Sequence, residues 1–375
     1  MTLIIKTGIV FLNIIYFFIK LLPTKKKVTM ISRQSDIPSD EFYMIKAEIE
    51  RRDPDVRVIL LCHTLNGGIK ASLFEKVRYC FHMFSQLYHI STSQVVVLDT
   101  YCMVISMLKH KKNLKIIQMW HSMGTMKKFG YTALDTGEGS SSKIAYAMRM
   151  HENYDYIFAS SEAYKQHLAD GFRCDINKIL TMPLPRLDLL KSEQYRQKVC
   201  KKIFKKYPEL KEKPIILYCP TFRKDERRFA KAYKRLDAAI DHEKYHFVVK
   251  LHPLSKINLG KKIVQIKDVS TFDMLFIADY IISDYSCIIY EAGVLGKPLY
   301  FYNFDMDIYE KNRGLAIDYM NELPGVISRN AKTITKAIES GEYDYEYLKQ
   351  FIEKYITMTD HATADIVDFI YQFIK

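Results

Sequence analysis

Short apolar runs alternate with helix-like stretches along most of this chain, and this alternation limits the fold more than any other feature. A first series of strand-like runs covers residues 28–32, 56–62, 94–98, 114–120 and 156–160. A second series covers residues 215–219, 246–251, 263–266, 280–283 and 299–302. Strands that alternate with helices favour βαβ units and mainly parallel sheets. The sequence therefore predicts an α/β fold with two such sheets.

The length of the chain fits this organisation. With 375 residues, it suits two α/β domains of middling size better than one core. A highly charged stretch, residues 191–213, separates the two series and indicates the boundary between the lobes. The expected parts are a membrane-associating helix and basic cluster (1–27), an N-terminal lobe (28–190), a C-terminal lobe (191–350) and a C-terminal helix (351–375).

The charge and the cysteines narrow the class of protein. A formal net charge of +13 predicts an anionic partner, which could be nucleic acid, anionic lipid or a phosphate-rich substrate. Charge alone does not choose among these three. The cysteines number seven, and no CxxC pair occurs among them. This pattern predicts reduced thiols in a cytosolic compartment and argues against a disulfide framework or a zinc site.

The N-terminal segment, residues 3–22, is strongly apolar and has about the 20 residues that a bilayer crossing needs. Lys6, Asn13 and Lys20 interrupt it at seven-residue spacing, which places them near one helix face. We interpret the segment as a helix lying in the membrane interface, with the lysines at 25–27 on anionic headgroups. A spanning anchor and a core helix are the alternatives. No A-x-A cleavage site follows, so a removed signal peptide is not expected.

Polar side chains follow several predicted strands at the points where these strands end. They are His121, Arg223, His252, Asp284 and Ser286. Because the carboxyl ends of parallel strands open onto one edge, where ligands bind, these groups could face a common cleft. Each has a structural alternative: a hydrogen-bonded strand-end histidine, a turn residue, a helix cap or a surface cation. Taken together, histidine for proton transfer and cations for a diphosphate favour the cleft.

Motifs for common cofactors are absent from the sequence. It contains no Gly-rich dinucleotide fingerprint, Walker loop, HExxH or GxSxG motif. The nearest acidic pair, Asp305 and Asp307, lies in a tyrosine-rich loop. We therefore expect no cofactor and no metal site.

Several segments, in order, resemble the CDP-glycerol glycerophosphotransferases of teichoic acid and capsule synthesis. They are IIQMWHSMGTMKKFG, YIFASSEAYKQHL, PLPRLDLL, ILYCPTFRKD, VVKLHPL, DMLFIADYIISDYSCIIYEAGVLGKPLYFYNFDMDIYEKNRGLAIDY and DHATADIVDFI. The length is similar to that of the primase-type members. The resemblance implies a GT-B fold, with two Rossmann-like lobes facing a central cleft and the nucleotide bound mainly by the C-terminal lobe. It also implies transfer of glycerol phosphate or ribitol phosphate from a CDP-alditol to the hydroxyl of a lipid-linked acceptor, with release of CMP.

The resemblance also assigns roles to residues. His121 corresponds to the proposed general base, and His252 to the histidine that supports the diphosphate. The donor-binding elements would be Arg223, Ser283, Asp284, Tyr285, Ser286, Arg313 and Gly314. Further candidates are Lys127, Ser160, Ser161, Arg186, Lys250 and Glu291. Departures from the family pattern, such as Cys287 in place of a common serine, leave both alditols open.

Asp284 needs a separate role, since a carboxylate would repel a diphosphate. We expect it to orient a histidine, cap a helix or contact the nucleoside. The expected enzyme is a peripheral or monotopic protein on the cytoplasmic face of the membrane that binds no nucleic acid. Two alternatives remain: a membrane-associated GT-B glycosyltransferase with a nucleotide-sugar donor, and a basic protein that binds nucleic acid or lipid without catalysis. The acceptor, the number of units added and the oligomeric state stay open.

Overall fold

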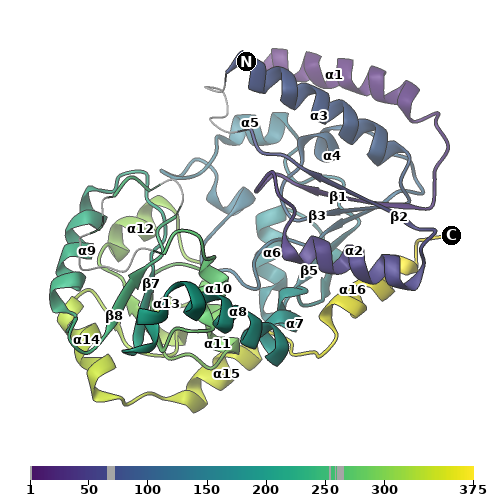
Figure 1. Ribbon diagram of the computed structural model, residues 1–375. Coiled ribbons are helices and arrows are strands. Elements are labelled where there is room, and N and C mark those ends of the chain that lie inside the picture. Colours follow the sequence, from purple (N-terminus) through teal and green to yellow (C-terminus); the bar gives the residue numbers. More distant parts are fainter. Residues whose placement is uncertain (1, 66–71, 253–254, 258, 260–265) are drawn as a thin grey trace. The chain divides into compact units, whose positions relative to one another are not determined.

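The computed structural model describes residues 2–65, 72–252, 255–257, 259 and 266–375. The chain forms two compact units (Figure 1). Unit 1 consists of residues 1–122, 129–188 and 359–375. Unit 2 consists of residues 123–128 and 189–358. Each unit contains one parallel sheet with helices around it, so the predicted α/β class with parallel sheets is confirmed.

Unit 1 is built on a six-stranded sheet in the order β2-β1-β3-β4-β5-β6, and every recorded pairing is parallel. The strands are β1 (Lys27–Ser32), β2 (Arg57–Cys62), β3 (Val95–Leu98), β4 (Lys115–Gln118), β5 (Tyr156–Ala159) and β6 (Ile179–Thr181). The central strand β3 has the sequence VVVL, and all four of its residues are buried. A parallel strand covered on both faces reads as a continuous apolar run, which explains why this series was visible in the sequence.

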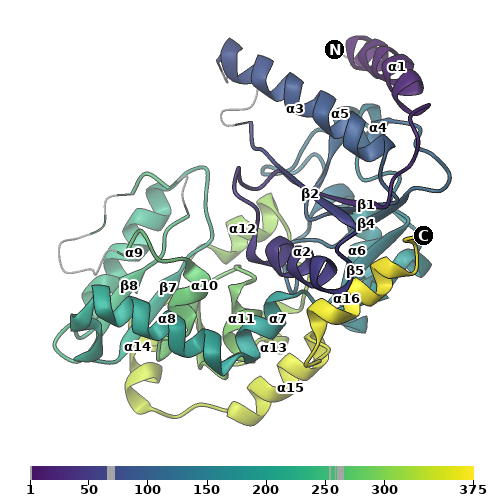
Figure 2. The same cartoon turned by 45° about the vertical axis from the view of Figure 1, so that its right-hand side comes forward.

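The helices of unit 1 flank this sheet. They are α1 (Thr2–Ile19), α2 (Asp40–Arg52), α3 (Leu73–Ser91), α4 (Met103–Met107), α5 (Ser142–Ala147), α6 (Lys165–Phe172) and α16 (Ala362–Tyr371). Helix α16 packs against α2, as both ribbon views show (Figures 1 and 2). Asp188 lies in α7 (Arg186–Lys191), and its carboxylate accepts hydrogen bonds from the main-chain N–H groups of Ala362 and Thr363, 2.9 Å each. This contact caps the first turn of α16 and holds the end of the chain in unit 1.

Unit 2 has a five-stranded sheet in the order β11-β10-β9-β7-β8, again with parallel pairings. Its strands are β7 (Ile215–Cys219), β8 (His246–Val249), β9 (Tyr280–Ser283), β10 (Leu299–Tyr302) and β11 (Ile327–Ser328). Its helices are α8 (Glu193–Lys206), α9 (Arg227–Ala239), α10 (Thr271–Leu275), α11 (Ile288–Val294), α12 (Met306–Asn312), α13 (Tyr319–Glu322), α14 (Ala331–Ser340) and α15 (Tyr345–Tyr355). Buried side chains of α9 and α14 pack on one face of this sheet.

The structure differs from the expected elements at β6, at β11 and in the C-terminal tail. The short strands β6 and β11 were not predicted, and most of the predicted strand at 263–266 lies outside the described residues. The C-terminal tail is two helices instead of one, since residues 356–361 are not helical. The apolar periodicity continues through α15 and α16, but α15 packs in unit 2 and α16 in unit 1.

Unlike most amphipathic helices of folded proteins, the N-terminal helix α1 exposes many of its apolar side chains to solvent. Two polar side chains of this segment contact the protein, whereas Lys6 is exposed: Asn13 Nδ2 donates to Met107 O at 3.2 Å, and Lys20 Nζ, directly after α1, donates to Lys109 O at 2.7 Å. Tyr16, between them, is buried and its hydroxyl lies 3.0 Å from His110 Nδ1. Among the described residues, no helix combines the length and apolar character required to cross a bilayer.

Candidate active site

His121 follows β4 in unit 1 and is held by a main-chain contact. Its Nδ1 lies 3.0 Å from the carbonyl oxygen of Asp99, the residue that follows β3. A carbonyl can only accept, so Nδ1 carries the hydrogen in this contact. In the neutral ring Nε2 is then the nitrogen that can take up a proton. This is the tautomer and fixed orientation that a general base requires.

Contacts between the carboxyl ends of β3 and β4 fix the backbone around His121. Gln118 is fully buried, and its side chain donates to Thr100 O at 3.2 Å and accepts from the N–H of Trp120 at 3.0 Å. Trp120 adopts a left-handed conformation with φ of 65°, which is unusual for a bulky residue. Its ring lies on that of His121, with centroids 4.3 Å apart. Strain of this kind persists only where the surroundings fix the backbone.

The other unit 1 candidates occupy less chemically accessible positions. Ser160 and Ser161, after β5, are both buried. Arg186 forms an ion pair with the buried carboxylate of Glu41, with Nε 2.5 Å from Oε1. The Arg186 charge is therefore balanced inside unit 1, which indicates a structural role.

In unit 2, the polar stretch 283–286 joins β9 to α11. Ser283 donates its hydroxyl to Cys219 O at 3.1 Å, which ties the end of β9 to β7. Asp284 is fully buried, and its Oδ1 accepts from the N–H groups of Thr221 at 2.8 Å and Tyr285 at 2.6 Å. Ser286 Oγ accepts from Ile288 N at 3.4 Å, in the first turn of α11. These contacts make Asp284 a buried support for the loop that starts α11.

Arg223 completes this support. Its guanidinium contacts Asp305 at 2.6 and 2.9 Å and lies 2.8 Å from Asp284 Oδ2. The Arg223 side chain is only 6% exposed, and the Tyr285 ring stacks on Tyr309 at 3.9 Å beside it. Two carboxylates thus balance one cation, and the pKa of Arg223 is raised because these carboxylates outweigh the effect of burial. This buried pairing favours a supporting role for Arg223 over direct contact with a diphosphate.

Other cations of unit 2 lie near the start of α11. Lys127, in the 123–128 segment, forms an antiparallel bridge with Leu315, and Lys128 N donates to Gly314 O at 3.1 Å. Burial lowers the pKa of Lys127, whereas the neighbouring Cys287 and Asp284 raise it. Burial of part of the ring and the Lys127 charge lower the pKa of His252. These couplings place His252 and Lys127 in one electrostatic neighbourhood.

The remaining candidates of unit 2 have identifiable partners or positions. Arg313 ends α12, and its charge lowers the pKa of Lys127, which places it in the same neighbourhood. Gly314 has φ of +80°, and a Cβ there would approach Lys128 Cδ to 2.7 Å. Lys250 donates to Ile266 O at 2.6 Å and to Val269 O, so it ties the end of β8 to another segment. Glu291 is buried within α11.

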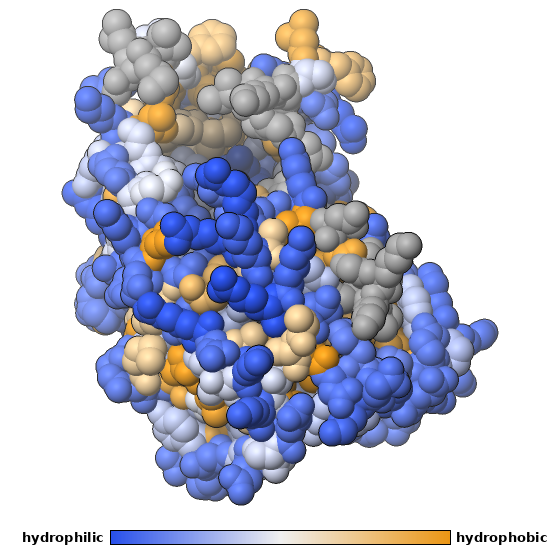
Figure 3. Space-filling view, turned by 90° about the vertical axis from the view of Figure 1, so that its left-hand side faces the viewer, coloured by the Kyte–Doolittle hydropathy of each residue, from blue (hydrophilic) through white to orange (hydrophobic). Residues whose placement is uncertain are grey.

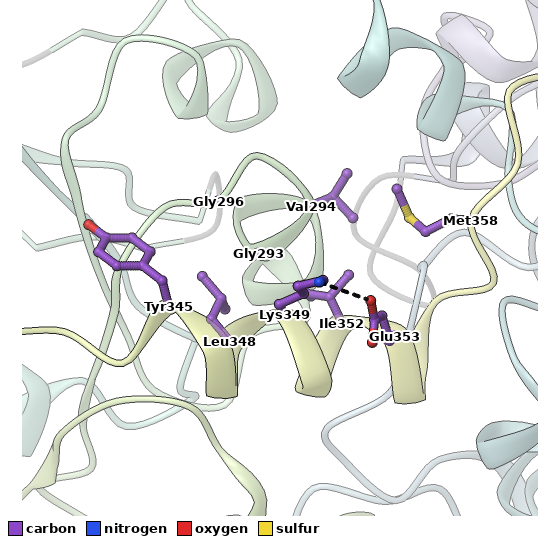
Figure 4. Close-up of a pocket in the computed structure, with 9 residues that line it drawn as sticks. All are labelled: Gly293, Val294, Gly296, Tyr345, Leu348, Lys349, Ile352, Glu353 and Met358. Carbon is purple, nitrogen blue, oxygen red and sulfur yellow. Dashed lines mark ion pairs between the residues drawn. The ribbon is translucent and has the colours of Figure 1, made fainter.

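An apolar pocket also lies in unit 2, between the end of α11 and helix α15 (Figure 4). Its lining residues are Gly293, Val294, Gly296, Tyr345, Leu348, Lys349, Ile352, Glu353 and Met358. Their charged groups are Lys349 and Glu353, which form an ion pair 4.0 Å long. With its charges balanced and its walls apolar, the pocket is poorly suited to a diphosphate.

Sequence reasoning did not select Asp99, Thr100 or Gln118. The first two follow the VVVL run and obey the same rule as His121, because they are polar residues at the end of a predicted strand. Gln118 was hidden, since it lies inside the predicted strand 114–120, which the structure ends two residues earlier. The association of residues 123–128 with unit 2 has no signal in the local sequence.

The chain matches one protein family over almost its whole length. The model of the family "CDP-Glycerol:Poly(glycerophosphate) glycerophosphotransferase" matches residues 14–372. The chain is similar to a teichoic acid ribitol-phosphate primase of Bacillus spizizenii, with 32% identity over 94% of this chain and 93% of that protein. It is also similar to a teichoic acid glycerol-phosphate primase of Bacillus subtilis, with 28% identity over 97% of both chains.

Solved structures show the same fold. The wall teichoic acid polymerase TagF matches with a TM-score of 0.72 and 22% identity, over 95% of this chain and 90% of that chain. A UDP-GlcNAc 2-epimerase from Neisseria meningitidis matches with a TM-score of 0.56 and 14% identity, over 92% of this chain and all of that chain. The fold is thus shared by proteins with different names, and only the sequence match separates them. On that match, this chain belongs to the CDP-glycerol:poly(glycerophosphate) glycerophosphotransferase family.

Proposed function

We propose that this protein transfers glycerol phosphate or ribitol phosphate from the corresponding CDP-alditol to a hydroxyl group of a lipid-linked acceptor. The family membership supports the reaction class. The observation that carries the proposal is the hydrogen bond from His121 Nδ1 to Asp99 O, which assigns the hydrogen of the neutral ring to Nδ1 and the basic lone pair to Nε2. A fixed imidazole at a strand end, with this tautomer, fits a base that activates a hydroxyl.

The proposed reaction is a single displacement at phosphorus. The acceptor oxygen bonds to the phosphorus that carries the alditol, while His121 Nε2 takes the hydroxyl proton. The bond between that phosphorus and the bridging oxygen of the diphosphate breaks, and CMP leaves with the electron pair. His252 and Lys127 are the proposed donors to the departing phosphate, together with the N–H groups that begin α11. Arg223 and Asp284 hold the loop before α11 in place.

We further propose that α1 and α3 bind an anionic membrane surface. The two helices pack against each other and lie together in both ribbon views (Figures 1 and 2). Large apolar side chains on and directly after α1 are exposed: Val10, Phe11, Ile14, Phe17, Phe18, Leu21 and Leu22. Those on α3 are Leu73, Phe74, Val77, Phe81, Phe84 and Tyr88. An exposed apolar face on this scale is typical of an interaction surface.

Charge favours lipid as the occupant of this face. Lys6 and Lys25 are exposed at the two ends of the α1 segment, and Lys76 and Arg78 are exposed on α3. Figure 3 shows hydrophilic residues over much of one face of the molecule, with hydrophobic residues at its upper end and in patches lower down. Apolar side chains with basic neighbours match an interface of acyl chains and anionic headgroups. The protein would then work as a peripheral or monotopic enzyme on the cytoplasmic face.

The reaction is tested by product analysis. Purified protein is incubated with a lipid-linked saccharide acceptor and, in separate samples, with CDP-glycerol, CDP-ribitol or a UDP-sugar. The proposal predicts CMP and an alditol phosphate ester of the acceptor with one or both CDP-alditols. Transfer from the UDP-sugar alone would instead identify a glycosyltransferase. Unchanged acceptor in every sample would contradict the proposal.

A further inference from the structure

The carboxyl group of Asp99 is the feature of unit 1 that the proposed reaction leaves unexplained. The residue is 3% exposed and lies at the carboxyl end of β3, in the middle of the sheet. Its main-chain oxygen is the group that His121 Nδ1 contacts. The buried carboxyl group and the carbonyl that contacts His121 therefore belong to the same residue.

The Asp99 carboxyl has polar neighbours, but few of them can donate a hydrogen bond to it. Thr100 Oγ1 lies 3.0 Å from Asp99 Oδ1, and the Ser32 hydroxyl is a second hydrogen-bonding neighbour. Thr100 Oγ1 and Ser32 Oγ accept from the N–H groups of Arg33 and Gln34 at 3.1 and 3.2 Å, so each hydroxyl can turn its own hydrogen to Asp99. These two hydroxyls and the main-chain N–H of Asp99 solvate the carboxylate much less than water does.

The charged groups near Asp99 do not balance the negative charge of its carboxylate. Glu41, from α2, raises its pKa further, although Arg186 holds Glu41 in an ion pair. Cys62, at the end of β2 on the far side of β1, has its own pKa raised to about 11 by burial and by Asp99. The guanidinium of Arg33 donates to Tyr101 O at 3.2 Å. Within the described part of the chain, no lysine, arginine or histidine forms an ion pair with Asp99.

Burial therefore raises the pKa of the Asp99 carboxyl to about 6, although hydrogen bonds from Ser32 and Thr100 lower it. At pH 7 the group is mostly ionised, and the buried charge costs stability. An asparagine would fill the same volume without that cost. A charge kept at such a position is a candidate for a functional role.

We propose that Asp99 is a positioning residue for His121, whose carboxylate favours the protonated imidazole that forms when the acceptor loses its proton. The negative charge and the carbonyl that receives the His121 N–H belong to one buried residue, so the charge acts on the imidazolium over a short distance and with little solvent screening. Protonation of Asp99 removes this support and slows proton transfer. This inference rests on the proposed function, because it assigns His121 as the base.

The test compares Asp99→Asn with the wild type in the full-length protein. In steady-state assays with a CDP-alditol and the lipid-linked acceptor, kcat should fall roughly tenfold, which is less than the roughly 10²- to 10⁴-fold contribution of a general base itself. The KM for the donor should not change, since the proposed donor groups belong to unit 2. The acid limb of the wild-type pH profile should lose its contribution near pH 6 in Asp99→Asn. Cys62→Ala, at the end of β2 in the same sheet, is the matched control and should keep the wild-type profile.

A second measurement is independent of turnover. Histidine NMR, with His121→Gln to assign the signal, should show that the pKa of His121 in Asp99→Asn lies roughly one unit below its wild-type value. An unchanged His121 pKa together with an unchanged pH profile would overturn the positioning role. A loss of kcat with equal loss of donor binding and no change in the His121 pKa would overturn it too, because it indicates a structural defect. Absence of transfer by the wild type would instead refute the proposed function, while the NMR result would still decide the link between Asp99 and His121.

Discussion

At the residue scale, side chains with similar sequence signals have different roles. His121 is fixed by one carbonyl in the tautomer of a base, whereas Arg223 is buried between two carboxylates. Both are polar residues that follow a strand, and the sequence suggested that both meet the substrate. The difference arises from partners distant in the chain, such as Asp305, which local pattern cannot reveal. Residue type predicted the chemistry available, but burial decides which groups can use it.

The first prediction concerns His121. Replacement by glutamine keeps a polar side chain but removes the basic nitrogen, so kcat should fall roughly 10²- to 10⁴-fold. Steady-state assay of CMP release measures this loss. His361→Gln, at an exposed position before α16, is the control and should retain wild-type activity. Equal activities of His121→Gln and the control would remove His121 from the mechanism.

The second prediction concerns the buried charges of unit 2. Arg223→Gln leaves Asp284 and Asp305 without their cation, and we expect it to lower the free energy of unfolding by about 3–5 kcal/mol. Arg227→Gln breaks the pair with Asp225, but the Arg227 side chain is 88% exposed and solvent screens that pair, so the cost should be far smaller. Urea unfolding of both variants measures the difference. Similar costs for the two would show that the buried ion pairs do not stabilise unit 2.

The third prediction concerns stability and pH. The pKa of Asp99 is 3.8 in its ordinary state and about 6 in the folded protein, so the folded state binds this proton more tightly. The resulting stabilisation is complete below about pH 4 and is lost as the pH rises through about 6, a change of ~3 kcal/mol. Asp99→Asn lacks this term, so its stability relative to the wild type should rise over the same interval. Urea unfolding at several pH values tests this, and parallel curves for the two proteins would contradict it.

At the element scale, the central strands were predictable and the edges were not. Strand β3 and strand β7 are buried along their whole length, and their continuous apolar runs identified them. Strands β6 and β11 are only three and two residues long, too short for a pattern. The orientation of α1 was also hidden: the spacing of Asn13 and Lys20 predicted a polar face, but not that this face contacts the protein. Periodicity defines the faces of a helix, and tertiary contacts decide where each face points.

The fourth prediction concerns the exposed faces of α1 and α3. The double variant Phe17→Glu/Phe18→Glu, and separately Phe81→Glu, should bind vesicles that contain phosphatidylglycerol at least tenfold more weakly than the wild type. Burial of one phenylalanine contributes about 1.5–3 kcal/mol, and each 1.4 kcal/mol is a factor of ten. Met320→Glu, on an equally exposed residue of α13, is the control. Vesicle cosedimentation measures binding, and wild-type binding by the α1 and α3 variants would refute the membrane surface.

At the scale of the whole molecule, each unit repeats one design: a parallel sheet with polar groups where its strands end. The sequence indicated this design and placed His121 and His252 at such ends. It could not show which segments of the chain belong to which unit. Residues 123–128 directly follow the His121 region, yet Tyr290 OH donates to Thr125 O at 3.1 Å and Lys127 pairs with Leu315 inside unit 2. Likewise, α16 returns to unit 1 through the cap from Asp188. Such long-range contacts depend on which surfaces match, and no local pattern encodes them.

The most direct test of the account measures the mass of the acceptor and the amount of CMP in the same reaction, for wild type and His121→Gln. The account predicts that the wild-type acceptor gains one or more alditol phosphate groups, that CMP appears in equal molar amount, and that His121→Gln produces almost none of either. Acceptor that gains a sugar instead, or equal alditol phosphate transfer by the wild type and His121→Gln, would contradict it.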